Sequence, residues 1–333
     1  MTAEFNFRRI TTYDELVSIE SEWRALYELA GQPSPFLDFD WVRMCWQQVV
    51  RRGGTPLAAL VQYDRRLVMA AALERRRFRV LFCRYYGLAD LLPQHDDILL
   101  HPEGDASAWL RVLQRGLRST LRDSAMLLPR LADHSSFAQR LLGSGRARAR
   151  QQIAKVDLEH GYAAYLSHFS RPTRNQMRRM WRQLGEGARV RHSDPDSFDS
   201  DFDWLLAQKR AWTPPGNAKL RAWLTDKATE DDFRLLARHW IASGKMRLGV
   251  LEGRGARVAA VLMLMAGEIA ILYTTTYDPA MGGTSPGRTV ALSMIEWSAN
   301  NGHLTVDFMG GRSSWKDRLK TGDYTRYRYK LPL

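Results

Sequence analysis

Hydrophobic residues spaced three and four positions apart predict two helices near the start of the chain, over residues 12–29 and from about residue 38 to residue 50. Short apolar runs bounded by turn-forming residues then predict strands. These strands fall at residues 57–63, 67–73, 78–86 and 97–100. A helix over residues 106–121 and a strand over residues 125–131 complete the pattern of the N-terminal half.

The C-terminal half repeats this order of elements. Asp232 precedes Trp240 at the same spacing at which Asp38 precedes Trp46. Two paired strands, a third strand, a helix and a final strand follow at residues 246–252, 258–265, 269–276, 286–300 and 304–309. The repetition indicates a duplicated α/β unit, and chance similarity between short apolar hairpins is the alternative.

A short basic stretch separates the two halves. Residues 146–192 carry 11 basic and three acidic side chains, which accounts for +8 of the total formal charge of +13. Helices are predicted within it at residues 162–169 and 173–185. In the second of these helices Arg174, Arg178 and Arg182 recur on one face. Such a face favours an anionic partner, and a solvated basic surface in an arginine-rich protein is the alternative.

The chain has 333 residues, of which 45% are hydrophobic, and this is enough for two domains of ordinary size. The acidic, turn-rich residues 194–203 mark the clearest internal boundary. We therefore expect a first unit over residues 1–145, a basic helical insertion over residues 146–203 and a second unit over residues 204–333.

Composition narrows the class of protein further. The two cysteines, Cys45 and Cys83, are too few for a disulfide scaffold or a cysteine-rich zinc site. The longest apolar run, over residues 258–266, is about half the ~20 residues that a membrane helix needs. Residues 1–10 lack the apolar core of a signal peptide. We expect a soluble, cytoplasmic protein without membrane insertion. The histidines do not have the spacing of metal ligands, so no metal site is expected. The sequence also contains no Walker loop and no glycine-rich dinucleotide-binding motif.

The sharpest local signal is the start of the last predicted helix. Ser285 is a favourable N-cap residue, Pro286 suits the first helical position, and Gly287 leaves the backbone bare. Open N–H groups of Gly287, Arg288 and Thr289, together with the Arg288 side chain, would form a phosphate cradle at the positive end of the helix. An ordinary capped helix is the alternative.

The C-terminal motifs carry a resemblance to a known family. The sequences Ser285-Pro-Gly-Arg288 and Asp307-Phe-Met-Gly-Gly-Arg-Ser-Ser-Trp-Lys316 resemble the tandem acyltransferases of the GNAT superfamily. The similarity is closest to the CelD-type, cellulose-biosynthesis-associated branch, which is related to the Fem-type peptidyltransferases. Trp315 stands where that branch usually has tyrosine.

This resemblance implies a fold and a division of labour. The fold is an α/β (α+β) arrangement of two GNAT-like mixed-sheet units, with helices packed on both faces and the basic helical insertion between them. The second unit would bind the acyl donor, and the acceptor amine would enter a cleft between the units. The donor would be acyl-CoA or an acyl carrier protein, and the donor-binding residues would be Ser285, Gly287, Arg288, Thr289, Arg174 and Arg178.

Acyl transfer to an amine needs positioning, removal of a proton and stabilisation of an oxyanion. The strand over residues 269–276 is expected to supply the oxyanion donor from its backbone. Asp278 and Asp307, at the ends of neighbouring strands, are the two carboxylates expected to accept the proton. A turn residue is the alternative for Asp278, and a partner of Lys316 or a backbone cap is the alternative for Asp307.

Three further side chains complete the expected catalytic set. Lys316 would neutralise a donor phosphate or an acceptor carboxylate, or pair with Asp307. Tyr277 and Tyr273 would protonate the leaving group, and packing within a strand is the alternative for both.

Two other functions share this fold. In the first, the donor is an aminoacyl-tRNA, as in Fem-type enzymes, and the arginines around Arg174 and Arg178 follow its phosphate backbone. In the second, the chain is a non-catalytic ligand-binding member of the fold. The expected partners are therefore a small-molecule amine together with an acidic acyl carrier protein or tRNA.

Overall fold

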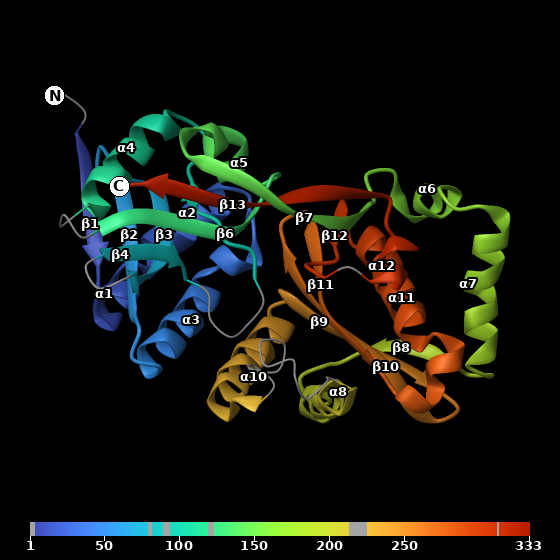
Figure 1. The fold of residues 1–333 in the computed structure, drawn as a ribbon. Coiled ribbons are helices and arrows are strands. Elements are labelled where there is room, and N and C mark those ends of the chain that lie inside the picture. The colour runs from blue at the N-terminus through green and yellow to red at the C-terminus, as the bar shows by residue number, and fades with distance from the viewer. Residues whose placement is uncertain (1–3, 79–81, 89–93, 119–122, 213–224, 312) are drawn as a thin grey trace. The chain divides into compact units, whose positions relative to one another are not determined.

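The computed structural model describes residues 4–78, 82–88, 94–118, 123–212, 225–311 and 313–333. The chain forms two compact units, which are shown in Figure 1. Unit 1 comprises residues 1–152 and the C-terminal residues 324–333. Unit 2 comprises residues 153–323.

Unit 1 is built on a mixed sheet. In spatial order its strands are β1 (Phe5–Ile10), β2 (Thr55–Tyr63), β3 (Arg66–Phe78), β4 (Phe82–Gly87), β6 (Asp123–Ala132), β13 (Gly322–Pro332) and the first part of β7 (Arg146–Asp157), with β5 (Leu99–Leu100) paired to β3. β4 and β6 run parallel, whereas β1–β4 form antiparallel pairs. Parallel neighbours need a crossover connection, and the chain between β4 and β6 includes the helix α4 (Ala106–Leu117).

Short helices pack against this sheet. They are α1 (Tyr13–Ser18), α2 (Glu20–Leu29), η1 (Pro35–Leu37), α3 (Phe39–Arg51), α4 (Ala106–Leu117), α5 (Ser136–Leu141) and η2 (Leu142–Ser144). A capping box between Thr12 and Glu15 starts α1, and the Asp38 carboxylate caps α3. One core cluster packs Trp109 of α4 and Phe137 of α5 against Tyr329 of β13.

Unit 2 contains a second mixed sheet. In spatial order its strands are β8 (Arg189–His192), β9 (Met246–Gly253), β10 (Ala256–Ala266), β11 (Ile269–Tyr277), β12 (Thr305–Asp307) and the last part of β7. β11 and β12 run parallel, and their neighbours pair antiparallel. The predicted order of helix, hairpin, strand, helix and strand is present in both units, as α3–β2–β3–β4–α4–β6 and as α10–β9–β10–β11–α11–β12. In each unit the last strand runs parallel to the strand that precedes the helix.

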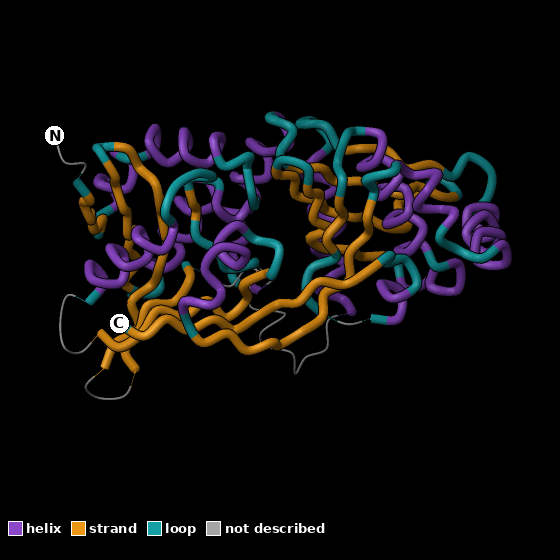
Figure 2. Tube along the Cα trace, turned by 90° about the horizontal axis from the view of Figure 1, so that it is seen from above, coloured by secondary structure: helices purple, strands orange, loops and turns teal. Residues whose placement is uncertain are grey.

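Helices lie on both faces of the unit 2 sheet, as Figure 2 shows. They are α6 (Gly161–Ser167), α7 (Arg171–Gln183), α8 (Phe198–Trp212), α10 (Lys227–Ala242), η3 (Pro279–Thr284), α11 (Pro286–Asn300) and the short α12 (Ser314–Asp317). On one face, Val290 and Ile295 of α11 pack in a cluster with Val261 and Leu272. On the other face, the buried ring of Phe233 in α10 stacks on Tyr273 of β11.

Several predicted boundaries need correction. The predicted helix over residues 12–29 is two helices that meet at Ile19. The predicted helix over residues 106–121 ends at Leu117, and its last three predicted positions lie outside the described residues. The predicted strand over residues 78–86 is the end of β3 and most of β4, with residues 79–81 outside the described part.

Within the described residues no helix meets the length and hydropathy needed to cross a membrane. Nor could any group of three or more acidic, histidine or cysteine side chains in this part of the chain hold a metal ion.

Candidate functional site

The site begins where β11 and β12 separate. Their parallel register runs from Ile269 paired with Thr305 to Ile271 paired with Asp307, and β11 then continues to Tyr277. On its other side, β11 has a β-bulge, because consecutive residues Leu262 and Met263 of β10 face Thr274 and Leu272. A bulge bends a strand and redirects its backbone groups, and bulges are frequent beside active sites. The edge of β11 past Ile271 is therefore the place where a backbone N–H could stabilise an oxyanion.

The start of α11 corrects one part of the predicted phosphate cradle. Ser285 has a left-handed backbone with φ of 56°, and its side chain caps no N–H group. Its carbonyl oxygen accepts hydrogen bonds from the N–H groups of Arg288 and Thr289, at 3.1 Å each. Thr289 is fully buried, and its hydroxyl donates to the same oxygen. The prediction that Ser285 caps the helix and leaves the Arg288 and Thr289 N–H groups open is therefore wrong.

The cause lies in the turn that precedes the helix. An N-cap side chain reaches the helical N–H groups from an extended backbone. Here the 3-10 turn over Pro279–Thr284 leads into α11 through a left-handed residue, so the hydroxyl of Ser285 is directed elsewhere. Gly287 is placed by a different constraint, because a Cβ atom at this position would lie 3.2 Å from Cδ1 of Tyr277. Tyr277 thus packs against the helix start.

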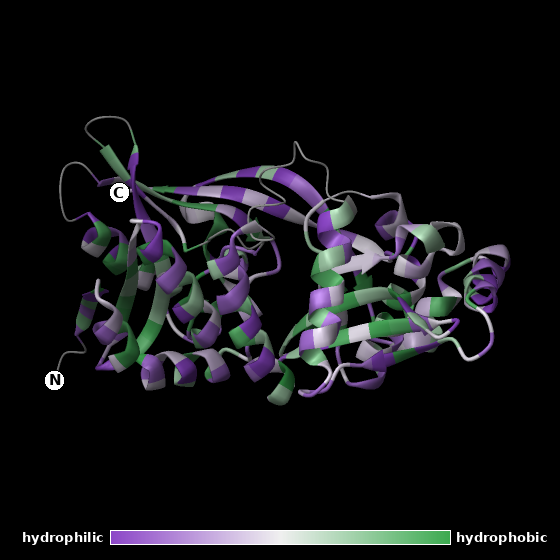
Figure 3. Cartoon of the chain, turned by 90° about the horizontal axis from the view of Figure 1, so that it is seen from below, coloured by the Kyte–Doolittle hydropathy of each residue, from purple (hydrophilic) through white to green (hydrophobic). Residues whose placement is uncertain are grey.

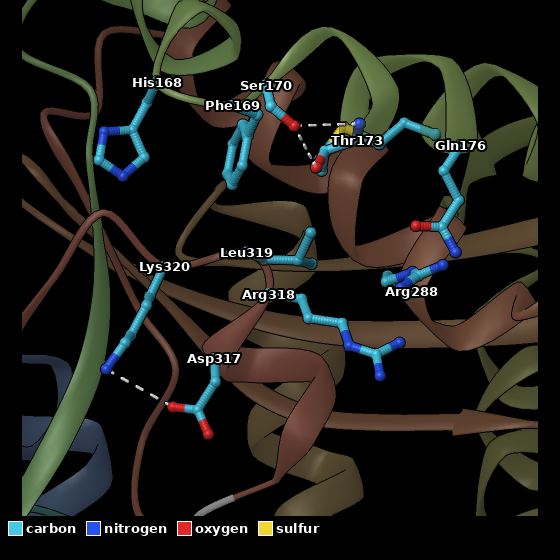
Figure 4. Close-up of a pocket in the computed structure, with 11 residues that line it drawn as sticks. His168, Phe169, Ser170, Thr173, Gln176, Arg288, Asp317, Arg318, Leu319 and Lys320 are labelled. Atoms are coloured by element: carbon cyan, nitrogen blue, oxygen red, sulfur yellow. Dashed lines mark hydrogen bonds and ion pairs between the residues drawn. The ribbon is translucent and has the colours of Figure 1, made fainter.

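An open pocket lies beside the first turn of α11. We call it the Arg288 pocket; its volume is about 450 Å³. The lining residues come from the segment between α6 and α7, from α7 and α11, and from the end of α12 and the residues after it (Figure 4): His168, Phe169, Ser170, Thr173, Gln176, Met177, Arg288, Asp317, Arg318, Leu319 and Lys320. Of the four residues in the predicted cradle, Arg288 lines this pocket. The pocket is therefore formed by side chains and not by open N–H groups at the helix start.

The charges in the Arg288 pocket favour an anion. Arg288 Nε and Nη2 lie 3.0 and 2.6 Å from the sulfur of Met180, and burial together with the charge of Arg318 lowers the pKa of Arg288. Lys320, in contrast, pairs with Asp317 at 3.5 Å and with Asp323 at 2.5 Å. Within the described residues no carboxylate pairs with Arg288 or Arg318, so these two guanidinium groups supply the positive charge of the pocket. A phosphate would relieve their mutual repulsion.

The two predicted carboxylates both accept hydrogen bonds from the backbone. Asp278 Oδ1 accepts from the N–H of Ala280 at 2.9 Å and starts the turn before α11. Asp307 is buried, and its Oδ1 accepts from the N–H of Met309 at 2.6 Å. Both contacts agree with the structural alternatives for these residues, and they also hold the carboxylates at the ends of β11 and β12.

Lys316 lies close to the end of β12. Its ammonium group donates hydrogen bonds to the carbonyl oxygens of Phe308 at 2.7 Å and Gly310 at 3.0 Å. It also lies 5.9 Å from the centre of the Trp315 ring. The backbone after β12 therefore fixes this charge beside the point where the two strands separate. Arg312, which belongs to the same motif, lies outside the described residues.

The two predicted tyrosines take opposite sides of the sheet. Tyr277 packs with the core cluster beneath α11. Tyr273 is the extra residue of the bulge, and its ring stacks on Phe233 with 5.8 Å between the ring centres. The bulge therefore separates the two side chains, and they do not form one acid pair.

Lys209 is a residue that the sequence analysis missed. It lies in the last turn of α8, and its ammonium group donates to the carbonyl oxygen of Thr275 at 2.9 Å. Burial and the positive charge of Lys316 lower the pKa of Lys209 to about 8. A second lysine is therefore held on β11 just past the bulge, and it gives up its proton more readily than an ordinary lysine does. No local sequence signal marks it, because its position depends on the packing of α8 against the sheet.

The lowered pKa of Lys209 predicts a pH dependence of stability. Between about pH 8 and the ordinary lysine pKa of ~10.4, the unfolded chain keeps a proton that the folded chain has released. The free energy of unfolding of the wild type should therefore rise with pH across this window relative to Lys209→Met. Urea unfolding of both proteins from pH 7 to pH 10 measures the difference. Two parallel pH curves would show that Lys209 titrates normally.

The remaining predicted donor-binding residues, Arg174 and Arg178, lie outside the Arg288 pocket. They line a smaller apolar groove of about 130 Å³ between α6, α7 and α11, which we call the Trp181 groove. Arg174 donates to the carbonyl oxygen of Phe169, and Arg178 donates to Asn175 Oδ1 at 3.1 Å. Met177 lines both the groove and the pocket, so the two cavities adjoin. Figure 3 shows α7 as a mainly hydrophilic helix.

Part of unit 2 is similar to a known protein family. Residues 171–317, which span α7 to α12, match the family model of the acetyltransferase (GNAT) domain. No curated protein sequence matches the chain. The matched residues make up most of unit 2, and they include five of the eleven residues that line the Arg288 pocket, Arg288 among them.

Solved structures extend the similarity to both units. A crystal structure of FemX matches with a TM-score of 0.61 and 11% identity, covering 98% of this chain and 97% of FemX. The C-terminal DUF2156 domain of an Agrobacterium fabrum protein matches with a TM-score of 0.57 and 10% identity, over 95% of this chain and 92% of that domain. A tandem GNAT protein from the clavulanic acid biosynthesis pathway matches with a TM-score of 0.50 and 12% identity, over 99% and 98%. The predicted fold of two GNAT-like mixed-sheet units is confirmed.

Proposed function

We propose that the chain is an N-acyltransferase that moves an acyl group from acyl-CoA or an acyl carrier protein to a small-molecule amine. The observation that carries this proposal is the Arg288 pocket, which lies at the start of the helix that follows the bulged, open-edged strand β11. A phosphorylated carrier held by Arg288 and Arg318 would extend its arm along β11. The motif from Asp307 to Lys316 further supports a place in the CelD-type branch.

The reaction requires little covalent chemistry from the protein. The amine attacks the thioester carbon, a C–N bond forms, the C–S bond breaks, and the thiolate leaves while the amine gives up a proton. A backbone N–H of β11 past Ile271 would stabilise the oxyanion. Asp307, Asp278 or the neutral form of Lys209 would accept the proton, and Tyr277 would protonate the leaving group. Lys316 would attract the negative charge that develops.

An aminoacyl-tRNA donor is the second candidate, and one observation favours it. Arg171, Arg178, Arg179 and Arg182 are exposed on α7, and none of them pairs with a carboxylate within the described residues. A row of unpaired arginines can follow a phosphate backbone. It can equally attract the acidic surface of an acyl carrier protein.

A thiol-release assay tests the proposal and separates the donors. Purified protein with acetyl-CoA and a panel of primary amines should release coenzyme A in an amine-dependent manner. The affinity for a coenzyme A donor should change only modestly between about 50 and 200 mM salt. A tRNA donor held through several phosphates would instead lose about 10³–10⁵ in affinity over this range. Tight acetyl-CoA binding without release at any amine would support the non-catalytic alternative and contradict the proposed activity.

A further inference from the structure

The Trp181 groove has the size and lining of a site for one flat ring. Its volume of about 130 Å³ is close to the ~150 Å³ of an engineered protein cavity that binds benzene, so it suits one aromatic ring system. Its walls are the half-buried rings of Trp181 and Tyr162 with the apolar side chains of Leu166, Met177 and Leu292. An extended acyl chain would need a longer apolar channel.

The two sides of the groove carry opposite charges. Arg174 and Arg178 supply positive charge from α7. Glu296, on α11, supplies the one carboxylate among the lining residues, and burial with the charge of Glu296 raises the pKa of Tyr162 to about 12. A ligand that fits this groove therefore combines a flat apolar ring, a hydrogen-bond donor for the carboxylate and negative charge nearby.

An adenosine phosphate has this combination of groups. We propose that the Trp181 groove binds the adenine base of the acyl donor, with its ring against Trp181 and its exocyclic amino group donating to Glu296. The phosphates then lie in the adjoining Arg288 pocket, across Met177. This inference rests on the proposed function. The same base ends both coenzyme A and the acceptor arm of tRNA, so the groove serves either donor.

The experiment compares ligands with and without the base. Coenzyme A and 4′-phosphopantetheine share the thiol arm and one phosphate, and coenzyme A alone carries adenosine. Trp181→Leu, which keeps an apolar side chain but removes the stacking surface, should weaken coenzyme A binding on the order of 10-fold and leave 4′-phosphopantetheine unchanged. Trp297→Leu, on the far part of α11, is the matched control and should leave both affinities unchanged. Isothermal titration calorimetry measures all of them.

The outcomes are separable from those of the proposed function. Unchanged 4′-phosphopantetheine binding shows that Trp181→Leu is folded. An equal loss for both ligands, or no loss for coenzyme A, would overturn the adenine assignment while leaving the Arg288 pocket intact. If the wild type binds a short RNA hairpin ending in CCA but not coenzyme A, the same variant should weaken RNA binding, and the donor is then tRNA. If it leaves RNA binding unchanged as well, the adenine assignment fails.

Discussion

Replacing Arg288 with alanine should weaken coenzyme A binding by about 1.5–3 kcal/mol, the usual contribution of a hydrogen bond to a charged group. This corresponds to about 10- to 150-fold in Kd. The reason is that Arg288 and Arg318 supply the positive charge of the pocket, and truncation removes one of the two. Calorimetric titration of coenzyme A into Arg288→Ala and the wild type measures the loss.

A matched control separates this effect from net charge. Arg182→Ala removes the same charge from an exposed position on α7 that does not line the Arg288 pocket, and it should change the affinity little. Arg288→Lys should recover part of the loss, because a point charge remains without the planar fork. Equal affinities for wild type and Arg288→Ala, in a variant with unchanged thermal stability, would remove the pocket from the donor site.

Replacing Asp201 with alanine should lower the free energy of unfolding by about 3–5 kcal/mol, as expected when one partner of a buried ion network is removed. Asp201 is fully buried in α8 and accepts hydrogen bonds from Arg191 at 2.5 and 2.6 Å, from Ser193 at 2.6 Å and from Arg257 at 2.8 Å. Burial alone would raise the pKa of Asp201, but these partners hold it below its usual value. Urea unfolding measures the change.

The neighbouring residue Asp203 provides the comparison. It pairs with Arg234 at 2.5 Å, but its own side chain is 67% exposed. Asp203→Ala should therefore cost about 1 kcal/mol or less. Similar losses for Asp201→Ala and Asp203→Ala would show that the Asp201 network does not fasten α8 to β8 and β10.

The sequence predicted the elements whose hydrophobic pattern is strong. α11 begins at Pro286 and ends at Asn300, as predicted, because a proline-glycine start and an apolar face define it. β7 was missed because Arg146–Arg150 alternate arginine with alanine alone and carry no large apolar side chain. β13 carries a usable signal, since Tyr327, Tyr329 and Leu331 alternate with basic residues. The sequence does not show which sheet this strand joins, because its partner β6 lies far away in the chain.

The site was predictable to a smaller degree. The sequence marks Arg288 by its place after a strand, and the structure brings it beside Arg318 in one pocket. The conformation of Ser285 depends on the preceding turn, so the capping prediction failed for a reason that residue preference does not contain. Lys209 and the Trp181 groove arise from helices that pack on opposite faces of the sheet, and such contacts leave no local pattern.

The most direct test of the central claim is a crystal structure of the protein with coenzyme A. The account predicts that the phosphates lie in the Arg288 pocket within hydrogen-bonding distance of the Arg288 guanidinium, with the thiol arm directed along the edge of β11 past Ile271. Ordered coenzyme A bound elsewhere, with this pocket holding solvent alone, would contradict it.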